Sequence, residues 1–267
     1  MRLLNRLLLI FLAVCAPLAA AEQRVRVGAY HFPPYVMKPE STAPEGMLPE
    51  LLAALNASQD RFRFDLVPTS VTRRYRDFSQ GRYDLILFES PDWGWQDIPL
   101  EKLDLQIGDA EVYVARRQNG RDQRFFDHLG GKRMALYNGY HYGFAGFNAD
   151  QDYLSRHFNA VLTYSHDSNL LMLLHGRVDI SVVTRSYLSI FQRENPEAAR
   201  ELLISERADQ VYHHHALLRP QGPLDAQGLA GLLRELQDSG RLDQLIRRYR
   251  LLAASEVAGE RADPMPR

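Results

Sequence analysis

Two stretches of the sequence, GRYDLIL at 81–87 and GRVDISV at 176–182, follow one pattern. Each comes after a segment of helical apolar periodicity and opens a short apolar run. A glycine in this place is typical of a helix that ends in the left-handed conformation, and the apolar run is typical of a buried strand. A repeated helix-to-strand junction predicts two lobes of similar α/β build. Two such lobes enclose a cleft, which indicates a site for a small molecule.

The first 21 residues have the pattern of an export signal. Arg2 and Arg6 precede an apolar run from Leu7 to Val14, and small residues at 19–21 follow it. This order is that of a secretory signal peptide, and we expect cleavage near Ala21. The single cysteine, Cys15, lies inside this leader, so the mature chain has no disulfide, and lipidation of Cys15 is left open.

The charge balance argues against a nucleic-acid partner. Lysine and arginine number 32 and acidic residues 33, which gives a formal net charge of −1 and no basic excess. No segment after the leader approaches the roughly 18 to 20 apolar residues that cross a bilayer. The length of 267 residues suits one large domain or two small lobes.

Apolar alternation and periodicity predict the same order of elements in both halves of the chain. In the first half we expect strands at 24–29, 62–66 and 84–88, and helices after Gly46 and at 72–80. In the second half we expect strands at 132–138, at 161–164 and from 179, and helices at 150–157 and 169–175. Extended stretches at 111–116 and 211–218 predict two crossings between the lobes.

This order of elements predicts parallel sheets, and ligands of such sheets bind beyond the carboxyl ends of the strands. In the first lobe the loops 30–35 and 89–95 lie there. In the second lobe the turns at 139–142 and 184–185 do. The sequence therefore predicts a binding site made from these four segments.

The ordered set of motifs resembles bacterial extracellular solute-binding proteins of family 3, the polar amino-acid-type periplasmic components of ABC importers. The matching features are the exported start, FPPY at 32–35, Gly46 followed by Glu50, both Gly/Arg/x/Asp junctions, GKR at 131–133 with Gly139 after it, and GRL at 240–242. They occur in order over nearly the whole mature chain.

The resemblance implies an α/β, two-lobe periplasmic binding protein fold (type II). Each lobe is then a parallel-type sheet flanked by helices, two crossing strands join the lobes, and the lobes close over one ligand in the periplasm. The implied boundaries are a signal peptide at 1–21, lobe 1 at 22–112 plus 214–257, lobe 2 at 113–213 and a flexible tail at 258–267.

The chain departs from this family where an α-amino acid would be held. The family usually places small hydroxyl residues and a carboxylate-binding arginine after the first junction strand, but here the loop reads FESPDWGWQ at 88–96. The family's ammonium-binding aspartate aligns with Thr184. Both poles of the usual clamp are missing from these positions.

The expected ligand-binding residues lie in the four strand-end segments: Phe32, Tyr35, Glu89, Trp93, Trp95, Gly139, Tyr140, His141, Thr184 and Arg185. Glu89 and Asp92, with the rings around them, could hold a cation. Arg73, Arg74 or Arg185 could instead hold an anion, and Gly139 opens a helix start whose amides suit an anionic group. The sequence leaves the charge of the ligand open.

Two histidine-containing motifs are better explained as structural. Neighbouring residues of a strand face opposite sides, so at most two of the histidines at 213–215 could share a metal ion. We predict no metal and no cofactor. His166 and Asp167 precede a helix, and we expect Asp167 or Ser168 to cap it.

These observations predict a monomeric solute-binding protein that closes over a small polar or aromatic ligand and delivers it to an ABC permease. One alternative is an enzyme on the same scaffold, similar to the cyclohexadienyl dehydratases, with Glu89 and His141 as acid or base. The sequence shows no nucleophile and base pair to support it, so we assign no catalytic residue. The other alternative is a protein that reports its ligand to a membrane receptor.

Overall fold

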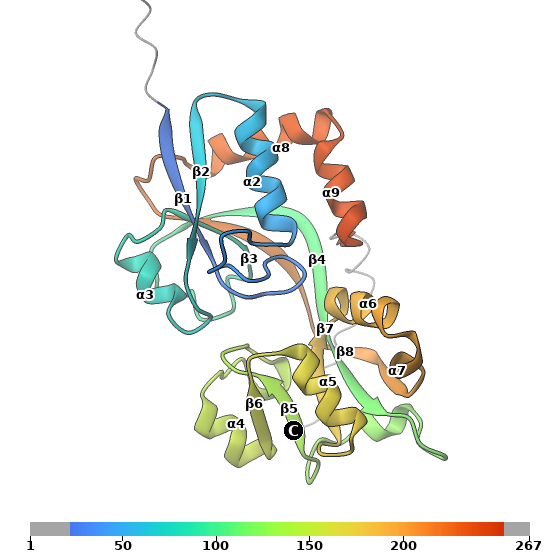
Figure 1. The fold of residues 1–267 in the computed structure, drawn as a ribbon. Helices are drawn as coiled ribbons and strands as arrows, with labels where there is room; N and C mark the ends of the chain where they lie inside the picture. Colours follow the sequence, from blue (N-terminus) through green and yellow to red (C-terminus); the bar gives the residue numbers. More distant parts are fainter. Residues whose placement is uncertain (1–21, 254–267) are drawn as a thin grey trace, which may run out of the picture.

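The computed structural model describes residues 22–253 and shows an α/β protein of two lobes joined by two long strands (Figure 1). One mixed sheet passes through both lobes in the order β2-β1-β3-β8-β4-β7-β5-β6, and the short β9 (Leu252–Ala253) pairs with β4. The predicted two-lobe fold is therefore confirmed. The expected leader and the expected tail lie outside the described residues.

Lobe 1, the upper part of Figure 1, is built on parallel strands, with β1 (Gln23–Ala29) between β2 (Phe62–Pro68) and β3 (Leu85–Glu89). Its helices are α2 (Met47–Ser58), α3 (Arg74–Ser79), α8 (Ala226–Asp238) and α9 (Arg241–Tyr249). Helix α2 begins after Gly46 and buries Leu48, Leu51, Leu52 and Leu55. This is the apolar stripe that the sequence predicts.

Lobe 2 repeats the plan, with β5 (Met134–Tyr137) in parallel between β6 (Ala160–Thr163) and β7 (Ile180–Thr184). Its helical segments are the 3₁₀ turns η1 (Gln123–Phe126) and η2 (Gly143–Ala145) and the helices α4 (Gln151–Phe158), α5 (His166–Leu174), α6 (Arg185–Glu194) and α7 (Pro196–Arg200). Helices α6 and α7 are not among the elements that the sequence pattern predicts.

The predicted cap of α5 is wrong. The helix begins at His166, and the side chain of Ser165 accepts a hydrogen bond of 3.1 Å from the backbone N–H of Ser168. Asp167 therefore lies in the first turn of the helix, where its carboxylate accepts a hydrogen bond from the hydroxyl of Tyr187. The sequence pattern places the start of this helix at residue 169, about one turn too late, because the first residues of α5 are polar.

The crossing strands β4 (Glu101–Arg116) and β8 (Leu202–Leu218) run antiparallel from the pair Glu101 and Leu218 to the pair Arg116 and Leu202. Strand β8 also pairs with β3 of lobe 1, and β4 also pairs with β7 of lobe 2. Both strands are longer than the stretches that the sequence predicts, and their first halves carry several charges.

The two repeated junctions have the same geometry. Gly81 and Gly176 have φ of +71° and +68°, the left-handed conformation that the pattern predicts. Asp84 accepts hydrogen bonds from the backbone N–H of Arg26 (3.1 Å) and from its Nη2 (2.6 Å). Asp179 accepts the same pair from Arg133, at 2.8 and 3.1 Å. Each aspartate thus ties the start of its strand to the parallel strand beside it.

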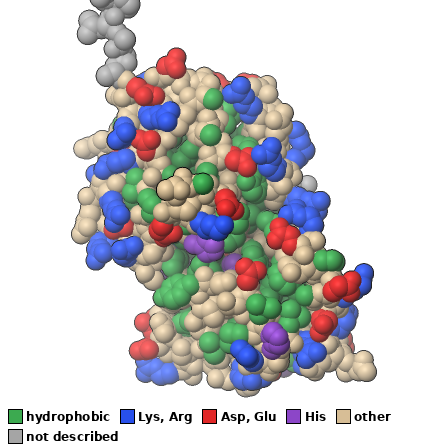
Figure 2. Space-filling view, in the orientation of Figure 1, with side chains coloured by type: hydrophobic (Ala, Val, Ile, Leu, Met, Phe, Trp, Pro, Cys, Tyr) green, Lys and Arg blue, Asp and Glu red, His purple; other side chains and the backbone are tan. Residues whose placement is uncertain are grey.

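The surface carries charges of both signs. In Figure 2, acidic and basic side chains are interspersed over lobe 1, and histidine side chains lie at the waist between the lobes. Within residues 22–253, no helix is both long and apolar enough to cross a membrane.

Candidate ligand-binding site

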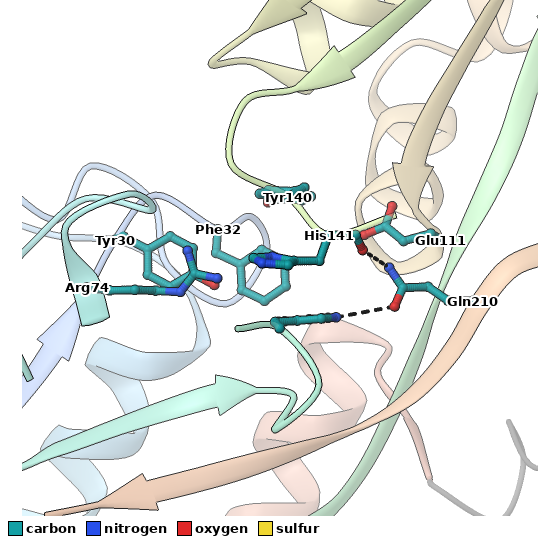
Figure 3. Close-up of a pocket in the computed structure, with 8 residues that line it drawn as sticks. Tyr30, Phe32, Arg74, Glu111, Tyr140, His141 and Gln210 are labelled. Atoms are coloured by element: carbon teal, nitrogen blue, oxygen red, sulfur yellow. Dashed lines mark hydrogen bonds between the residues drawn. The ribbon is translucent and has the colours of Figure 1, made fainter. Parts of the chain in front are cut away.

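A small cavity lies between the lobes and against the crossing strands. Its lining comes from all of these parts: Tyr30, Phe32, Arg74 and Trp93 from lobe 1, Tyr140 and His141 from lobe 2, Glu111 from β4 and Gln210 from β8. Figure 3 shows Arg74 and Tyr30 at one end and Glu111 and Gln210 at the other, with Phe32, Tyr140 and His141 between them. A molecule held here contacts both lobes.

The aromatic rings reach the cavity from the carboxyl ends of parallel strands. Tyr30 directly follows β1, Trp93 lies in the loop after β3, and Tyr140 lies in the turn after β5. Two prolines after Phe32 prevent further strand pairing, and backbone hydrogen bonds of 2.9 Å between Phe32 and Val36 close the loop. The position agrees with the general rule for ligands of parallel sheets.

The two lobes contact one another across the cavity. Gln210 accepts a hydrogen bond of 3.2 Å from Trp93 Nε1 and donates one of 2.5 Å to the carbonyl oxygen of His141 (Figure 3). The ring of Phe32 meets that of Tyr140 edge-on, with centroids 5.7 Å apart. These contacts describe a conformation in which the lobes are closed on each other.

A buried ion pair supports the lobe 1 end of the cavity. Arg74 Nε lies 3.2 Å from Glu89 Oε1, and both side chains are almost completely buried. Trp95 Nε1 donates a hydrogen bond of 2.8 Å to the other oxygen of Glu89. Burial raises the pKa of Glu89 and the Arg74 charge opposes that rise. Glu89 therefore balances the charge of Arg74 from behind, while Arg74 itself lines the cavity.

Glu111 lies at the other end of the site, where its carboxyl group faces the cavity without a counter-charge. The side chain is buried from bulk solvent, and Oε2 has no hydrogen-bond partner among residues 22–253. Burial raises the pKa of Glu111 well above its ordinary value, and the nearby acids Asp109 and Asp209 raise it further. An unpaired buried carboxyl is costly to maintain without a ligand.

His141 and Tyr140 add two more polar atoms without partners in the described part of the chain, the histidine Nδ1 and the tyrosine hydroxyl. Burial, with the Arg74 charge nearby, lowers the pKa of His141 to about 4. His141 is therefore neutral at physiological pH. It can donate or accept one hydrogen bond but adds no charge to the site.

No protein-family model and no curated protein matches this sequence. Several solved structures do. A histidine kinase sensor domain with similarity to periplasmic binding proteins aligns over 87% of this chain and 99% of its own, at a TM-score of 0.64 and 19% identity. The substrate-binding protein of an ABC uptake transporter from Streptococcus pneumoniae, with bound histidine, aligns over 85% of this chain and 92% of its own, at a TM-score of 0.66 and 14% identity.

A third match is an ancestral amino-acid-binding protein, a precursor of cyclohexadienyl dehydratase. It aligns over 85% of this chain and 94% of its own, at a TM-score of 0.61 and 13% identity. This chain has the fold of the periplasmic binding proteins. At such identities the likeness concerns the fold, and the chemistry of the site must come from this chain's own residues.

The periplasmic binding protein fold brings only part of the predicted site to the cavity. Of the ten predicted residues, four line it: Phe32, Trp93, Tyr140 and His141. Glu89 and Trp95 lie behind Arg74. Tyr35 is buried, donates a hydrogen bond of 2.8 Å to Asp109, and packs against Phe88 with ring centroids 4.7 Å apart.

The predicted residues after β5 and β7 have other places in the fold. Gly139 has φ of +81°, and a Cβ there would lie 3.0 Å from Val71 Cγ1 of the opposite lobe. Thr184 is buried and caps α6 by accepting a hydrogen bond of 3.3 Å from the N–H of Tyr187. Arg185 begins α6 and lines a separate small pocket with Asp109 and Ser186. These residues shape the second lobe beside the cavity.

Sequence reasoning missed Glu111 and Gln210 as site residues. A signal for Gln210 is present in β8, where buried and half-buried residues alternate from 208 to 216 and Gln210 is a polar side chain on the buried face. Neither position follows a parallel strand, and only such positions were expected to carry the site. The histidines of β8 bind elsewhere: His213 Nδ1 lies 3.3 Å from Asp104 Oδ2, and His214 is buried among aromatic rings.

Proposed function

We propose that this protein is a periplasmic solute-binding protein whose lobes close over a small polar or aromatic molecule. The observation that carries the proposal is the composition of the cavity, which takes lining residues from lobe 1, from lobe 2 and from both crossing strands. A ligand in contact with all of them stabilises the closed arrangement relative to an open one.

Several features of the lining support recognition of a ligand over a purely structural core. Glu111, Tyr140 and His141 present polar atoms without partners in the described part of the chain. Buried polar groups are nearly always hydrogen-bonded in folded proteins. A ligand with polar groups can satisfy these atoms, and the rings of Phe32 and Trp93 offer it apolar surface.

The test is a thermal-shift screen of the mature protein against amino acids, polyamines, organic acids and aromatic amines. A molecule that binds the folded state alone raises the midpoint by an amount set by its affinity and concentration. We expect a dose-dependent rise for one chemical class, with saturation that follows a single-site curve. A screen in which no small molecule raises the midpoint would contradict the proposal.

Trp93→Ala identifies the site of that shift. The variant loses a ring that lines the cavity and its hydrogen bond to Gln210, so we expect at least a tenfold loss of affinity, or about 1.4 kcal/mol. Phe147→Ala is the matched control, because Phe147 is a 40% exposed aromatic residue of lobe 2 away from the cavity. An undiminished shift in Trp93→Ala would place the ligand elsewhere.

Delivery to an ABC importer is the role that we propose for the ligand-bound form. Uptake of the identified ligand should then fail in cells without the protein and return with the wild-type chain but not with Trp93→Ala. If uptake is unaffected and a ligand-dependent signal is lost instead, the partner is a membrane receptor. The structural resemblance to a histidine kinase sensor domain is the reason to measure signalling beside uptake.

The enzyme alternative has its own readout in the same mixtures. Turnover would appear as product in the NMR spectrum of the ligand incubated with the protein. We expect the ligand to be recovered unchanged, since the acid that sequence reasoning considered for catalysis, Glu89, is enclosed in its ion pair with Arg74.

A further inference from the structure

We infer that the cavity binds a compact organic cation, a protonated amine or quaternary ammonium that carries no carboxylate, with Glu111 as its counter-charge. This inference rests on the proposed binding function and adds the chemical class of the ligand. Two observations support it: the unpaired carboxyl of Glu111, for which the lining holds no counter-charge, and the aromatic rings of the lining.

Glu111 differs from the two other acids near it on the crossing strands. Asp109 accepts hydrogen bonds from the hydroxyls of Tyr35 (2.8 Å) and Ser186 (2.5 Å). Asp209 accepts them from the hydroxyl of Tyr113 (2.6 Å) and from the backbone N–H groups of Gly143 and Phe144. Glu111 keeps an oxygen without a partner among the described residues, and it is the acid that lines the cavity.

The lining offers no positive charge to Glu111 once its internal ion pair is counted. Arg74 is the cationic side chain of the lining, and Glu89 balances it at 3.2 Å. His141 is neutral. Burial raises the pKa of Glu111, and the carboxyl has no counter-charge in the lining when it is ionised. An anionic ligand would meet this charge directly, and a ligand carboxylate would compete with Glu89 for Arg74.

The ring of Phe32 stacks on that of Tyr30, at 10° with centroids 5.7 Å apart, and meets two further rings of the lining edge-on. The plane of Phe32 lies at 81° to that of Trp93 and at 87° to that of Tyr140, with centroids 6.1 and 5.7 Å away. Ring faces attract cations. The same cluster already holds one, because the Arg74 guanidinium lies 5.0 Å from the centroid of Tyr30. A second, compact cation between these rings and Glu111 would likewise contact aromatic surface.

Ionisation of Glu111 on cation binding would release a proton, which can be measured separately from affinity. The groups that face this carboxyl are acids on both crossing strands, Asp109 and Asp209, and tyrosines whose hydroxyls are neutral, Tyr35, Tyr140, Tyr142 and Tyr212. None of them supplies positive charge. A cation that binds beside the carboxyl favours its ionised form, so binding should release a proton to the buffer.

The experiment compares probes of similar shape and different charge on the mature protein. Benzylammonium, benzyltrimethylammonium and tetramethylammonium are the cations, benzyl alcohol is the neutral probe, benzoate the anion and phenylalanine the zwitterion. Affinities come from thermal shift and calorimetry, and calorimetry in two buffers of different ionisation enthalpy measures proton release. We expect at least one cation to bind about tenfold more tightly than benzyl alcohol, and no binding of benzoate.

Glu111→Gln tests the counter-charge with little change of shape. We expect cation affinity to fall about tenfold or more and proton release to vanish, while any affinity for benzyl alcohol changes less than about twofold. Glu206→Gln is the matched control, the same substitution at an exposed position of β8, and should leave all affinities unchanged. Urea unfolding of each variant confirms that it is folded.

Two outcomes would overturn the inference while leaving the proposed function intact. One is tighter binding of benzoate, phenylalanine or benzyl alcohol than of every cation. The other is cation binding that Glu111→Gln does not weaken. Failure of every molecule in both panels to bind would instead overturn the proposed function itself.

Discussion

Strands β3 and β7 begin alike and end differently, and the difference separates the scaffold from the site. At the start of each strand a left-handed glycine and an aspartate paired to an arginine make the same contacts in both lobes. At the ends, β3 delivers Glu89 into a buried ion pair beneath the cavity, whereas β7 delivers Thr184 as the cap of α6. The repeated part forms the lobe, and the part that follows it is free to differ.

The comparison also explains where the cavity obtains its chemistry. Lobe 1 supplies a balanced ion pair and several rings, and lobe 2 supplies Tyr140 and His141. The unbalanced acid comes from neither strand end but from β4, which both lobes share. A residue on a crossing strand stays beside the cavity whichever lobe moves, so it is well placed to hold a ligand through closure.

The largest expected effect is at the end of β3. Glu89→Ala leaves the Arg74 guanidinium buried without its counter-charge, and we expect a loss of about 3 to 5 kcal/mol of unfolding free energy. Thr184→Ala at the equivalent position of β7 removes only a helix cap and should cost about 1 kcal/mol. Urea unfolding measures both. Equal losses would mean that the two strand ends are not energetically distinct.

A smaller difference is expected between the two aspartates of the repeat. The Asp84 side chain is 7% exposed and that of Asp179 33%, so solvent screens the second pair more strongly. We expect a loss of about 2 kcal/mol for Asp84→Ala, reduced from the fully buried case because Arg26 is partly exposed, and of about 1 kcal/mol or less for Asp179→Ala.

Asp152→Ala provides the control for that measurement, because Asp152 pairs with Arg156 on an exposed helix face and its loss should change stability by less than about 0.5 kcal/mol. A larger loss at Asp179 than at Asp84 would show that burial does not set the strength of these junctions.

The smallest effect concerns one buried histidine on each side of the cavity. Burial lowers the pKa of His214, which packs in the rings of lobe 1, and of His166 in α5 to about 3. In the unfolded chain these histidines take up protons near the ordinary histidine pKa of about 6.5, whereas in the folded chain they do not. Stability is therefore highest above that pH and falls as the pH falls toward 3, by about 1 kcal/mol per histidine at pH 6.

His214→Phe and His166→Phe should each remove the loss of stability that one histidine causes between pH 8 and pH 6. The change in urea midpoint between these two pH values measures it. His175→Phe, at an exposed position, is the control. A pH dependence that neither buried variant reduces would show that other groups govern acid unfolding.

Much of the fold follows from local patterns in the sequence. The glycines at 81 and 176 need left-handed backbone, and the leucines of α2 recur at helical spacing. The extended stretch expected at 211–218 lies within β8. Each of these depends on residues close in sequence, so each can be predicted without the partner segment. Helix α6 escaped prediction because it directly follows β7 and its polar residues obscure the apolar spacing, and α7 is only five residues long.

The candidate site could be predicted from the sequence only in part, and Glu89 shows why. Its position directly after a buried strand placed it correctly at the strand end, but whether it faces the cavity depended on Arg74, fifteen residues earlier and on a different element. Glu111 and Gln210 lie on strands whose sheet positions are set by long-range pairing.

The sequence by itself determined the two repeated junctions, the alternation of strands and helices that leads to β3 and β7, and the aromatic character of the loops, because these depend on short-range backbone preference and apolar spacing. Only the tertiary structure decided which charges are balanced and which face the cavity. The physical reason is that the free energy of a buried charge depends on partners that folding brings within a few ångströms from distant parts of the chain. For this protein, that distinction separates Glu89, which has a partner in Arg74, from Glu111, which has no counter-charge in the described chain.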